Sequence, residues 1–224
     1  MTSSATIASQ LAKIKAEIPK SVRLIAVTKY VSAEEIRQAY EAGMRDFGES
    51  KIQDAQSKIE ALKDLPGIKW HFIGHLQSNK AKLAVQIFDW IHSVDSLKLA
   101  RRLERLAKEQ DMQPNVCLQV KVRSDPDKFG WNTTELMSAL PELSQFHQLQ
   151  LKGLMSILPR GLSDGEILSA FQDTKRLAEQ IQDHPDYAIP MTELSMGMSQ
   201  DYPLAIQAGA TMIRLGRILF PSLT

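Results

Sequence analysis

Apolar and polar positions alternate along the chain with two periods, one typical of helices and one typical of buried strands. The first segment has apolar residues at helical spacing, Ile7, Leu11, Ile14 and Ile18. This spacing predicts a helix that Pro19 ends. The run from Leu24 to Lys29 is short, apolar and β-branched, which predicts a buried strand.

The same alternation continues through the rest of the chain. Further strands are predicted to end near Glu49, Gly74, Asp95, Val122, Ile157, Gly197 and Gly216. Helical stripes separate most of these strands. Two of the helices begin at capping boxes, Ser32 with Glu35 and Ser163 with Glu166, whose side chains satisfy free amides of the first turn. Gly43 marks the predicted end of the earlier helix.

About eight strands that alternate with helices imply a parallel sheet with right-handed crossovers. Such units close most naturally into a (β/α)8 TIM barrel, whose usual size is about 250 residues, here with an extra N-terminal helix. An open doubly wound sheet is the alternative, but no G-x-G-x-x-G fingerprint follows the first strand. The length of 224 residues and the absence of a linker-like stretch predict one domain, residues 1–224.

Composition and charge narrow the class of protein. The chain has 27 basic and 26 acidic side chains, without the basic excess of a nucleic-acid-binding domain or of a polybasic membrane contact. The one cysteine, Cys117, excludes an intramolecular disulfide and a zinc site built from several thiolates. No apolar run has the length of a membrane span, and the first residues lack a signal-peptide pattern. We therefore expect a cytoplasmic protein that binds neither nucleic acid nor membrane.

Two predicted strands end in a lysine, and active sites of such barrels lie at the carboxyl ends of the strands. Lys29 closes the first strand, where partial burial would favour the neutral, nucleophilic amine that attacks a carbonyl. Lys121, near the end of the fifth strand, alternates with Cys117 and Gln119 and can face inward as well. Position alone favours a solvated lysine at each strand end and does not choose between the two.

The last two strand ends predict a different kind of site. The turn after the seventh strand contains Ser195, Gly197 and Ser199, and the eighth strand ends in the run Arg214–Arg217. Backbone amides around glycines, hydroxyl groups and helix N-termini bind anions. Barrels frequently bind phosphate with the loops that follow strands seven and eight. Together the two segments predict a phosphate site.

Other polar residues near strand ends carry weaker signals. His71, His75 and His92 have no metal-ligand spacing with nearby carboxylates, so we expect structural roles and no metal. Asp125 and Asp127 flank a proline, which predicts a turn rather than a catalytic pair. A lysine opposite a phosphate site fits pyridoxal 5′-phosphate (PLP), whose aldehyde forms a Schiff base with lysine. A phosphorylated sugar aldehyde in an aldolase fits the same layout, and the residues alone leave both open.

Seven sequence blocks, in order along nearly the whole chain, resemble those of a known family. They are residues 26–29 (AVTK), 46–49 (DFGE), 70–80 (WHFIGHLQSNK), 91–95 (IHSVD), 153–155 (GLM), 194–201 (LSMGMSQD) and 209–216 (GATMIRLG). The block that ends at Lys80 and the block around Ser195 are the most specific. On these blocks the chain resembles the pyridoxal phosphate homeostasis proteins. The resemblance implies a single barrel similar to the N-terminal domain of alanine racemases, with PLP held covalently.

The resemblance also implies roles for individual residues. Lys29 matches the lysine that forms the Schiff base, in preference to Lys121. The other positions that match cofactor-binding residues are Ser195, Gly197, Ser199, Arg214, Gly216 and Arg217. Arg214 matches the arginine beside the pyridine nitrogen, where it would disfavour a protonated ring and weaken the electron sink of the cofactor. Ser50 departs from the family, which commonly has asparagine there.

The function implied by the resemblance involves no turnover. The chain is expected to bind, buffer and hand over PLP, with effects on vitamin B6 and amino-acid balance, and no catalytic residue is assigned. The implied partners are PLP, PLP-dependent apoenzymes and regulatory proteins. A monomer is expected, because a racemase-type dimer completes each site with a second domain. The alternative is a PLP-dependent amino-acid racemase or lyase on the same site.

Overall fold

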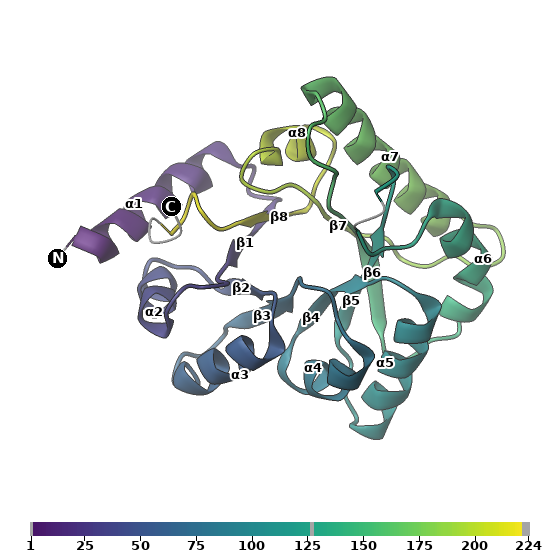
Figure 1. Ribbon diagram of the computed structural model, residues 1–224, viewed down its shortest axis with the longest axis horizontal. Coiled ribbons are helices and arrows are strands. Elements are labelled where there is room, and N and C mark those ends of the chain that lie inside the picture. The colour runs from purple at the N-terminus through teal and green to yellow at the C-terminus, as the bar shows by residue number, and fades with distance from the viewer. Residues whose placement is uncertain (1, 126–127, 221–224) are drawn as a thin grey trace.

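The strands form a closed barrel, which confirms the predicted (β/α)8 architecture. The computed structural model describes residues 2–125 and 128–220. Its strands are β1 (Arg23–Val27), β2 (Asp46–Glu49), β3 (Lys69–Phe72), β4 (Trp90–Val94), β5 (Asn115–Val120), β6 (Gln150–Ser156), β7 (Glu193–Ser195) and β8 (Met212–Leu215). Neighbouring strands pair in parallel and β8 closes on β1. Figure 1 shows the strands as a ring with the helices outside it.

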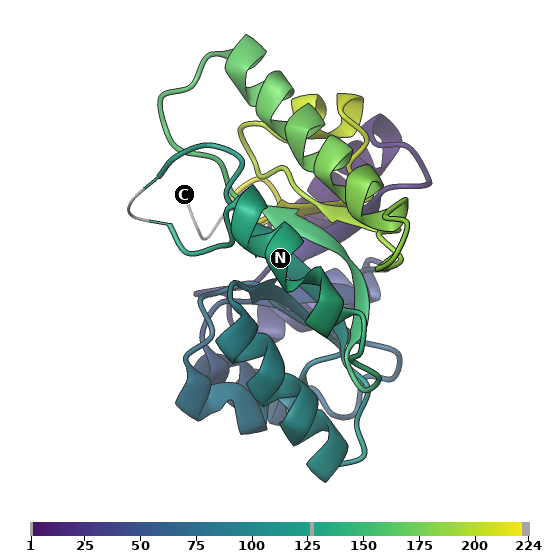
Figure 2. The same ribbon diagram turned by 90° about the vertical axis from the view of Figure 1, so that its right-hand side faces the viewer.

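The helices form the outer layer of the barrel. They are α1 (Thr2–Glu17), α2 (Ala33–Glu41), α3 (Ile52–Ala61), α4 (Ala81–Ile87), α5 (Leu97–Glu109), α6 (Thr133–Leu143), α7 (Asp164–Gln182) and α8 (Tyr202–Gln207), with the 3-10 helix η1 (Ser78–Lys80). Figure 2 shows them flanking the sheet from the side. The expected extra N-terminal helix is α1, which packs against α2. Within residues 2–125 and 128–220, no helix combines the length and apolar character needed to cross a bilayer.

Local signals in the sequence set several helix ends. The predicted capping boxes begin α2 and α7. The structure adds a third box at the start of α6, where the Asn132 side chain accepts from the backbone N–H of Glu135 at 2.8 Å. Gly43, just beyond α2, has a φ of 94°, a left-handed conformation that glycine adopts without strain.

Alternate residues of each strand face different surroundings, because successive side chains point to opposite faces of a sheet. The outward-facing side chains pack in one large cluster between sheet and helices. The inward-facing apolar side chains form a separate small cluster, Ile25, Trp90, Cys117, Met155 and Met212. His71, His92, Ser195 and Arg214 are also buried. Barrel interiors are commonly filled by branched apolar side chains, so this polar set points to a function inside the barrel.

Two strands end earlier than the sequence predicted. β1 ends two residues before Lys29, and β5 ends at the residue before Lys121, so both lysines lie on loops beyond the sheet. Tyr30 has a φ of 68°, a left-handed conformation that a β-strand does not contain. Of the turn predicted at Asp125 and Asp127, residues 126–127 lie outside the described part of the chain.

Candidate functional site

Three neighbouring strands bring most of the predicted site residues to one sector of the barrel mouth. β8 pairs with β7 on one side and with β1 on the other. The register aligns Ala26 of β1 with Leu215 of β8. Lys29 therefore leaves the sheet beside the turn that begins at Gly216, and the loop that follows β7 lies on the other side of this turn. The topology thus joins the two sites that the sequence predicted separately.

The backbone just before Lys29 is anchored from outside the barrel. The Lys58 ammonium on α3 donates to the Thr28 carbonyl at 2.7 Å and to Oε1 of Glu49 at 2.8 Å. The Thr28 hydroxyl donates to the same oxygen at 2.6 Å. Glu49 is completely buried. Lys29 itself is exposed, because β1 ends before it reaches this residue, as position alone favoured; the alternative of partial burial is not met.

The loop that follows β7 has a shape that requires glycine at its start. Gly197 has a φ of 94°, and a Cβ atom there would lie 2.6 Å from the Cβ of Ala205. The Asp201 carboxylate accepts the N–H of Met198 at 2.6 Å and closes the turn. The Gly197 carbonyl accepts the backbone N–H of Arg214 at 3.0 Å, which ties this loop to β8.

Backbone amides on the two adjacent loops are unpaired. Among the described residues, no acceptor meets the N–H groups of Gly197, Ser199, Gly216 and Arg217. Backbone N–H groups are obligatory donors, so free ones that lie close together favour an anion. The backbone of these loops, in addition to the serine side chains, therefore offers donors where the sequence predicted a phosphate site.

Arg214 lies inside the barrel with only 3% of its surface exposed. One terminal nitrogen donates to Oγ of Ser195 at 2.7 Å, and the other donates to the Ser156 carbonyl at 2.9 Å. Burial lowers the pKa of the guanidinium to about 10, and the Asp201 carboxylate partly opposes this effect. In the described part of the chain, no carboxylate forms an ion pair with Arg214, so the arrangement favours an anionic ligand nearby.

The Ser195 side chain forms hydrogen bonds inside the barrel, whereas the Ser199 side chain does not. The buried Ser195 hydroxyl lies 2.8 Å from Nδ1 of His92 and accepts from Arg214. Any direct contact of this hydroxyl with an anion therefore competes with two existing hydrogen bonds. Ser199 is half-buried.

His71 and His92 are buried, and in the described part of the chain no group of three or more His, Cys, Asp or Glu residues could hold a metal ion.

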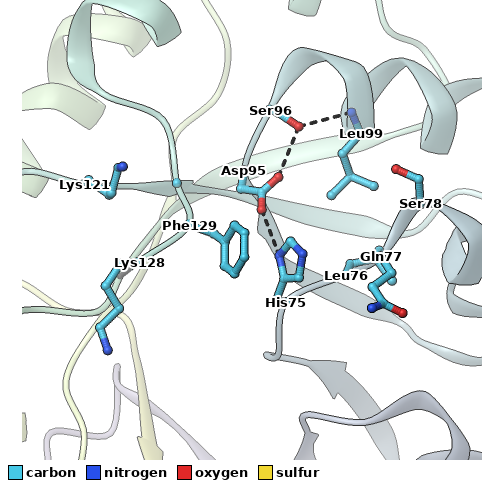
Figure 3. A pocket seen from close by; sticks show the side chains of 11 residues that line it. His75, Leu76, Gln77, Ser78, Asp95, Ser96, Leu99, Lys121, Lys128 and Phe129 are labelled. Carbon is cyan, nitrogen blue, oxygen red and sulfur yellow. Dashed lines mark hydrogen bonds and ion pairs between the residues drawn. The ribbon is translucent and has the colours of Figure 1, made fainter. Parts of the chain in front are cut away.

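Lys121 lies at a different sector of the mouth, because β5 is on the opposite side of the ring from β1. It lines a cavity of about 390 Å³ together with Lys128. In this cavity the rings of His75 and Phe129 are stacked with centroids 3.6 Å apart, and Nδ1 of His75 lies 3.2 Å from the Asp95 carboxylate (Figure 3). The structure therefore does not bring Lys121 to the loops with unpaired amides.

Three acidic or basic residues around the site were not predicted from the sequence. Glu49 and Lys58 anchor the chain before Lys29, and Oδ1 of Asp46 lies 3.0 Å from Nε2 of His71. The alternation of β2 could have placed Asp46 on the inward face. The contact of Lys58 depends on how α3 packs against the barrel, and no local pattern indicates it.

The sequence and the fold both match known proteins. The model of the alanine racemase N-terminal domain matches residues 3–222. An alanine racemase of Clostridium difficile has a TM-score of 0.75 at 15% identity, and the match covers 96% of this chain and 56% of the racemase, which extends beyond the shared fold. The fold is thus a barrel of the alanine racemase N-terminal class.

Proteins of higher sequence identity show the family within this class. A pyridoxal phosphate homeostasis protein of Synechocystis is 51% identical over 212 residues, which are 95% of this chain and 96% of the relative. PipY of Synechococcus elongatus, solved without PLP, is 50% identical with a TM-score of 0.93 and coverage of 96% and 99%. PipY has also been solved with PLP bound, at 49% identity and a TM-score of 0.92. The chain belongs to the pyridoxal phosphate homeostasis protein family, which confirms the resemblance.

Proposed function

We propose that this chain binds PLP for vitamin B6 homeostasis, with downstream effects on amino-acid balance. The observation that carries the proposal is the placement of Lys29 beside two loops with unpaired amides and above a buried arginine. The relatives support it, since one of about half-identical sequence is known with PLP bound. In this proposal the barrel is a single cofactor-binding domain.

The donor set fits each part of PLP. In this proposal Lys29 holds the aldehyde carbon as a Schiff base, because its side chain is exposed beside these loops, whereas the nearby Lys58 ammonium is paired with Glu49. The phosphate is bound by the loop of Ser195, Gly197 and Ser199 and by the turn of Gly216 and Arg217, whose free N–H groups suit a dianion. PLP bound here supplies an electrophilic aldehyde and a ring that can delocalise charge.

Arg214 bears on turnover but does not by itself decide between storage and catalysis, because racemases with such an arginine still turn over; the missing acid on the second face of the substrate carries the inference. An arginine beside the pyridine nitrogen donates a hydrogen bond and disfavours ring protonation, which weakens the electron sink. We infer a carrier rather than an enzyme. The alternative is a racemase or lyase on the same site.

We place this carrier in the cytoplasm, with PLP-dependent apoenzymes or regulatory proteins as its partners. The one cysteine, Cys117, is buried and free, which is compatible with a reducing compartment. We expect a monomer, which sedimentation at micromolar concentration checks. A stable dimer would contradict the monomer.

The test of the proposed function is the absorption spectrum of the purified protein, followed by borohydride reduction and peptide mapping. We expect a bound PLP chromophore and a reduced adduct on Lys29. An adduct on Lys121 with Lys29 unmodified would contradict the assignment, and a protein that binds no PLP would contradict the function.

A further inference from the structure

A continuous chain of hydrogen bonds crosses the interior of the barrel and ends at Arg214. Its members come from β2, β3, β4, β7 and β8 and are Asp46, His71, His92, Ser195 and Arg214. Oδ1 of Asp46 lies 3.0 Å from Nε2 of His71, and Nδ1 of His71 lies 2.9 Å from Nε2 of His92. The Ser195 hydroxyl then joins Nδ1 of His92, at 2.8 Å, to Arg214, at 2.7 Å.

Burial favours the neutral form of both imidazoles. Desolvation lowers the pKa of His71, although Asp46 opposes the effect, and it lowers the pKa of His92 well below the ordinary value. The positive charges of Arg214 and Arg23 add to the effect on His92. Each neutral imidazole has one N–H donor and one acceptor nitrogen.

The direction of every hydrogen bond follows from the Asp46 carboxylate. A carboxylate only accepts, so Nε2 of His71 carries the proton and its Nδ1 accepts from Nε2 of His92. Nδ1 of His92 must then accept the proton of Ser195. The Ser195 oxygen accepts from Arg214, which can only donate. All five groups are satisfied in this one arrangement.

We propose that Asp46, His71 and His92 are positioning residues of the cofactor site that orient Ser195 and Arg214. This inference rests on the proposed function. The chain gives the buried guanidinium an acceptor of fixed orientation at Ser195, while the Ser156 carbonyl holds its other terminal nitrogen. The remaining N–H groups of Arg214 are then directed toward the ligand.

The chain also changes the role of Ser195. Its proton is committed to His92 and its oxygen to Arg214, so it contributes to cofactor binding through the arginine. The phosphate is then met by the backbone amides and the Ser199 hydroxyl. Histidine tautomers and cofactor affinity therefore depend on Asp46, although the Asp46 side chain is 23% exposed at the far end of the chain.

The first test measures the histidine tautomers in the protein without PLP, by two-bond 15N–1H correlation spectra. We expect a protonated Nε2 and a bare Nδ1 in both His71 and His92. Asp46→Asn keeps an acceptor oxygen and should preserve both tautomers, whereas Asp46→Leu removes the acceptor and should produce the other tautomer of His71. A wild-type His92 with its proton on Nδ1 would overturn the proposed direction.

The second test measures the PLP dissociation constant of the same variants by absorption titration. We expect Asp46→Leu to raise it by about tenfold, because a reversed His92 makes the Ser195 oxygen accept from two donors and loosens Arg214. Asp46→Asn should remain near the wild-type value. Equal affinities of the wild type and both variants would refute the positioning role.

A matched control separates positioning from packing. Trp90 stacks on His71 with the ring planes 11° apart but forms no link of the chain. Trp90→Phe should lower thermal stability and leave the tautomers unchanged, and altered tautomers in this variant would contradict the inference. A wild-type protein that binds no PLP at all would instead refute the proposed function, so the two failures are distinguishable.

Discussion

Two strands, β1 and β5, are each followed at the barrel mouth by a lysine, yet the two lysines have different neighbours. Lys29 lies beside the loops that follow β7 and β8, with their unpaired amides. Lys121 lies across the ring in a cavity with a stacked His75–Phe129 pair. A lysine at a strand end is therefore a site only where the neighbouring strands supply the rest of the chemistry.

The two strand ends also differ in how their backbones are held. The Thr28 carbonyl accepts from Lys58, whose ion-pair partner Glu49 is completely buried. Beyond β5, Lys121 donates its backbone N–H to the Trp131 carbonyl at 2.8 Å, and the nearby Arg123 pairs with the half-buried Asp173 on α7. The β1 end is thus anchored by a buried charge pair, and the β5 end by backbone bonds and a partly solvated pair.

The largest effect that we predict separates the two lysines. Lys29→Ala should abolish covalent labelling with PLP and borohydride, because the neighbouring Lys58 ammonium is held by the Thr28 carbonyl and the buried Glu49 carboxylate. Lys121→Ala should retain wild-type labelling. Mass spectrometry of the reduced proteins checks both, and labelling that survives in Lys29→Ala but not in Lys121→Ala would reverse the comparison.

The next effect concerns the two anchors. Lys58→Met should cost about 3–5 kcal/mol of unfolding free energy, because it leaves the buried Glu49 carboxylate without its partner. Arg123→Met should cost about 0–1 kcal/mol, because this pair with Asp173 is partly solvated. Chemical denaturation measures both values. Similar losses in the two variants would show that burial does not distinguish the anchors.

A smaller effect tests the anion site. Ser199→Ala should weaken PLP binding by about 1.5–3 kcal/mol, the range for a hydrogen bond to a charged group. The double replacement of Ser195 and Ser199 by alanine should weaken it further, and pyridoxal without phosphate should bind poorly to the wild type. Ser124→Ala, on the loop beyond β5, is the matched control and should bind PLP normally.

Equilibrium titration with PLP and with pyridoxal measures these differences. Equal binding of the two ligands by the wild type would contradict the anion site.

The sequence predicted the elements well where the signal is local. Apolar periodicity gave the eight strands, capping boxes gave the starts of α2 and α7, and Gly43 gave the end of α2. The position of Lys29 beyond β1 was not predictable from its apolar run, because the left-handed backbone at Tyr30 has no signature in a tyrosine.

The interior of the candidate site was less predictable for a different reason. Asp46, His71 and His92 contact each other only because the closed barrel turns the inward faces of β2, β3 and β4 toward one centre. Each residue taken singly resembles an ordinary polar residue of a strand. The contact between Asp46 and His71, which are 25 positions apart, results from closure of the sheet and cannot be predicted from the local sequence pattern.

The smallest expected effect is the absence of racemisation, for which the placement of the four tyrosines is decisive. Racemisation needs an acid or base on each face of the substrate α-carbon, within hydrogen-bond reach. Lys29 can serve one face, and in the resembled racemases a tyrosine from a partner subunit's second domain serves the other. The Tyr40 hydroxyl donates to the Pro66 carbonyl, and Tyr187 precedes β7 at the opposite end of the barrel.

The remaining two tyrosines are near the mouth loops. The Tyr202 hydroxyl donates to Glu17 of α1 at 3.2 Å, in the helical layer. Tyr30 was expected on a strand, facing away from Lys29. It lies instead on the loop with 72% of its surface exposed, and the ammonium of Lys51 lies 5.6 Å from the centre of its ring. Neither tyrosine is buried at a fixed position against the proposed ligand.

We therefore expect no efficient formation of the opposite enantiomer when the purified protein is incubated with L- or D-alanine in deuterated water, as measured by chiral chromatography alongside proton NMR. The Lys29 amine alone can remove an α-proton, but without a group on the opposite face it returns the proton to the side from which it came. Multiple turnovers that disappear in Lys29→Ala would show that the chain is an enzyme. Loss of the same turnovers in Tyr30→Phe would identify the exposed tyrosine beside Lys29 as the second acid, because this substitution removes only the hydroxyl.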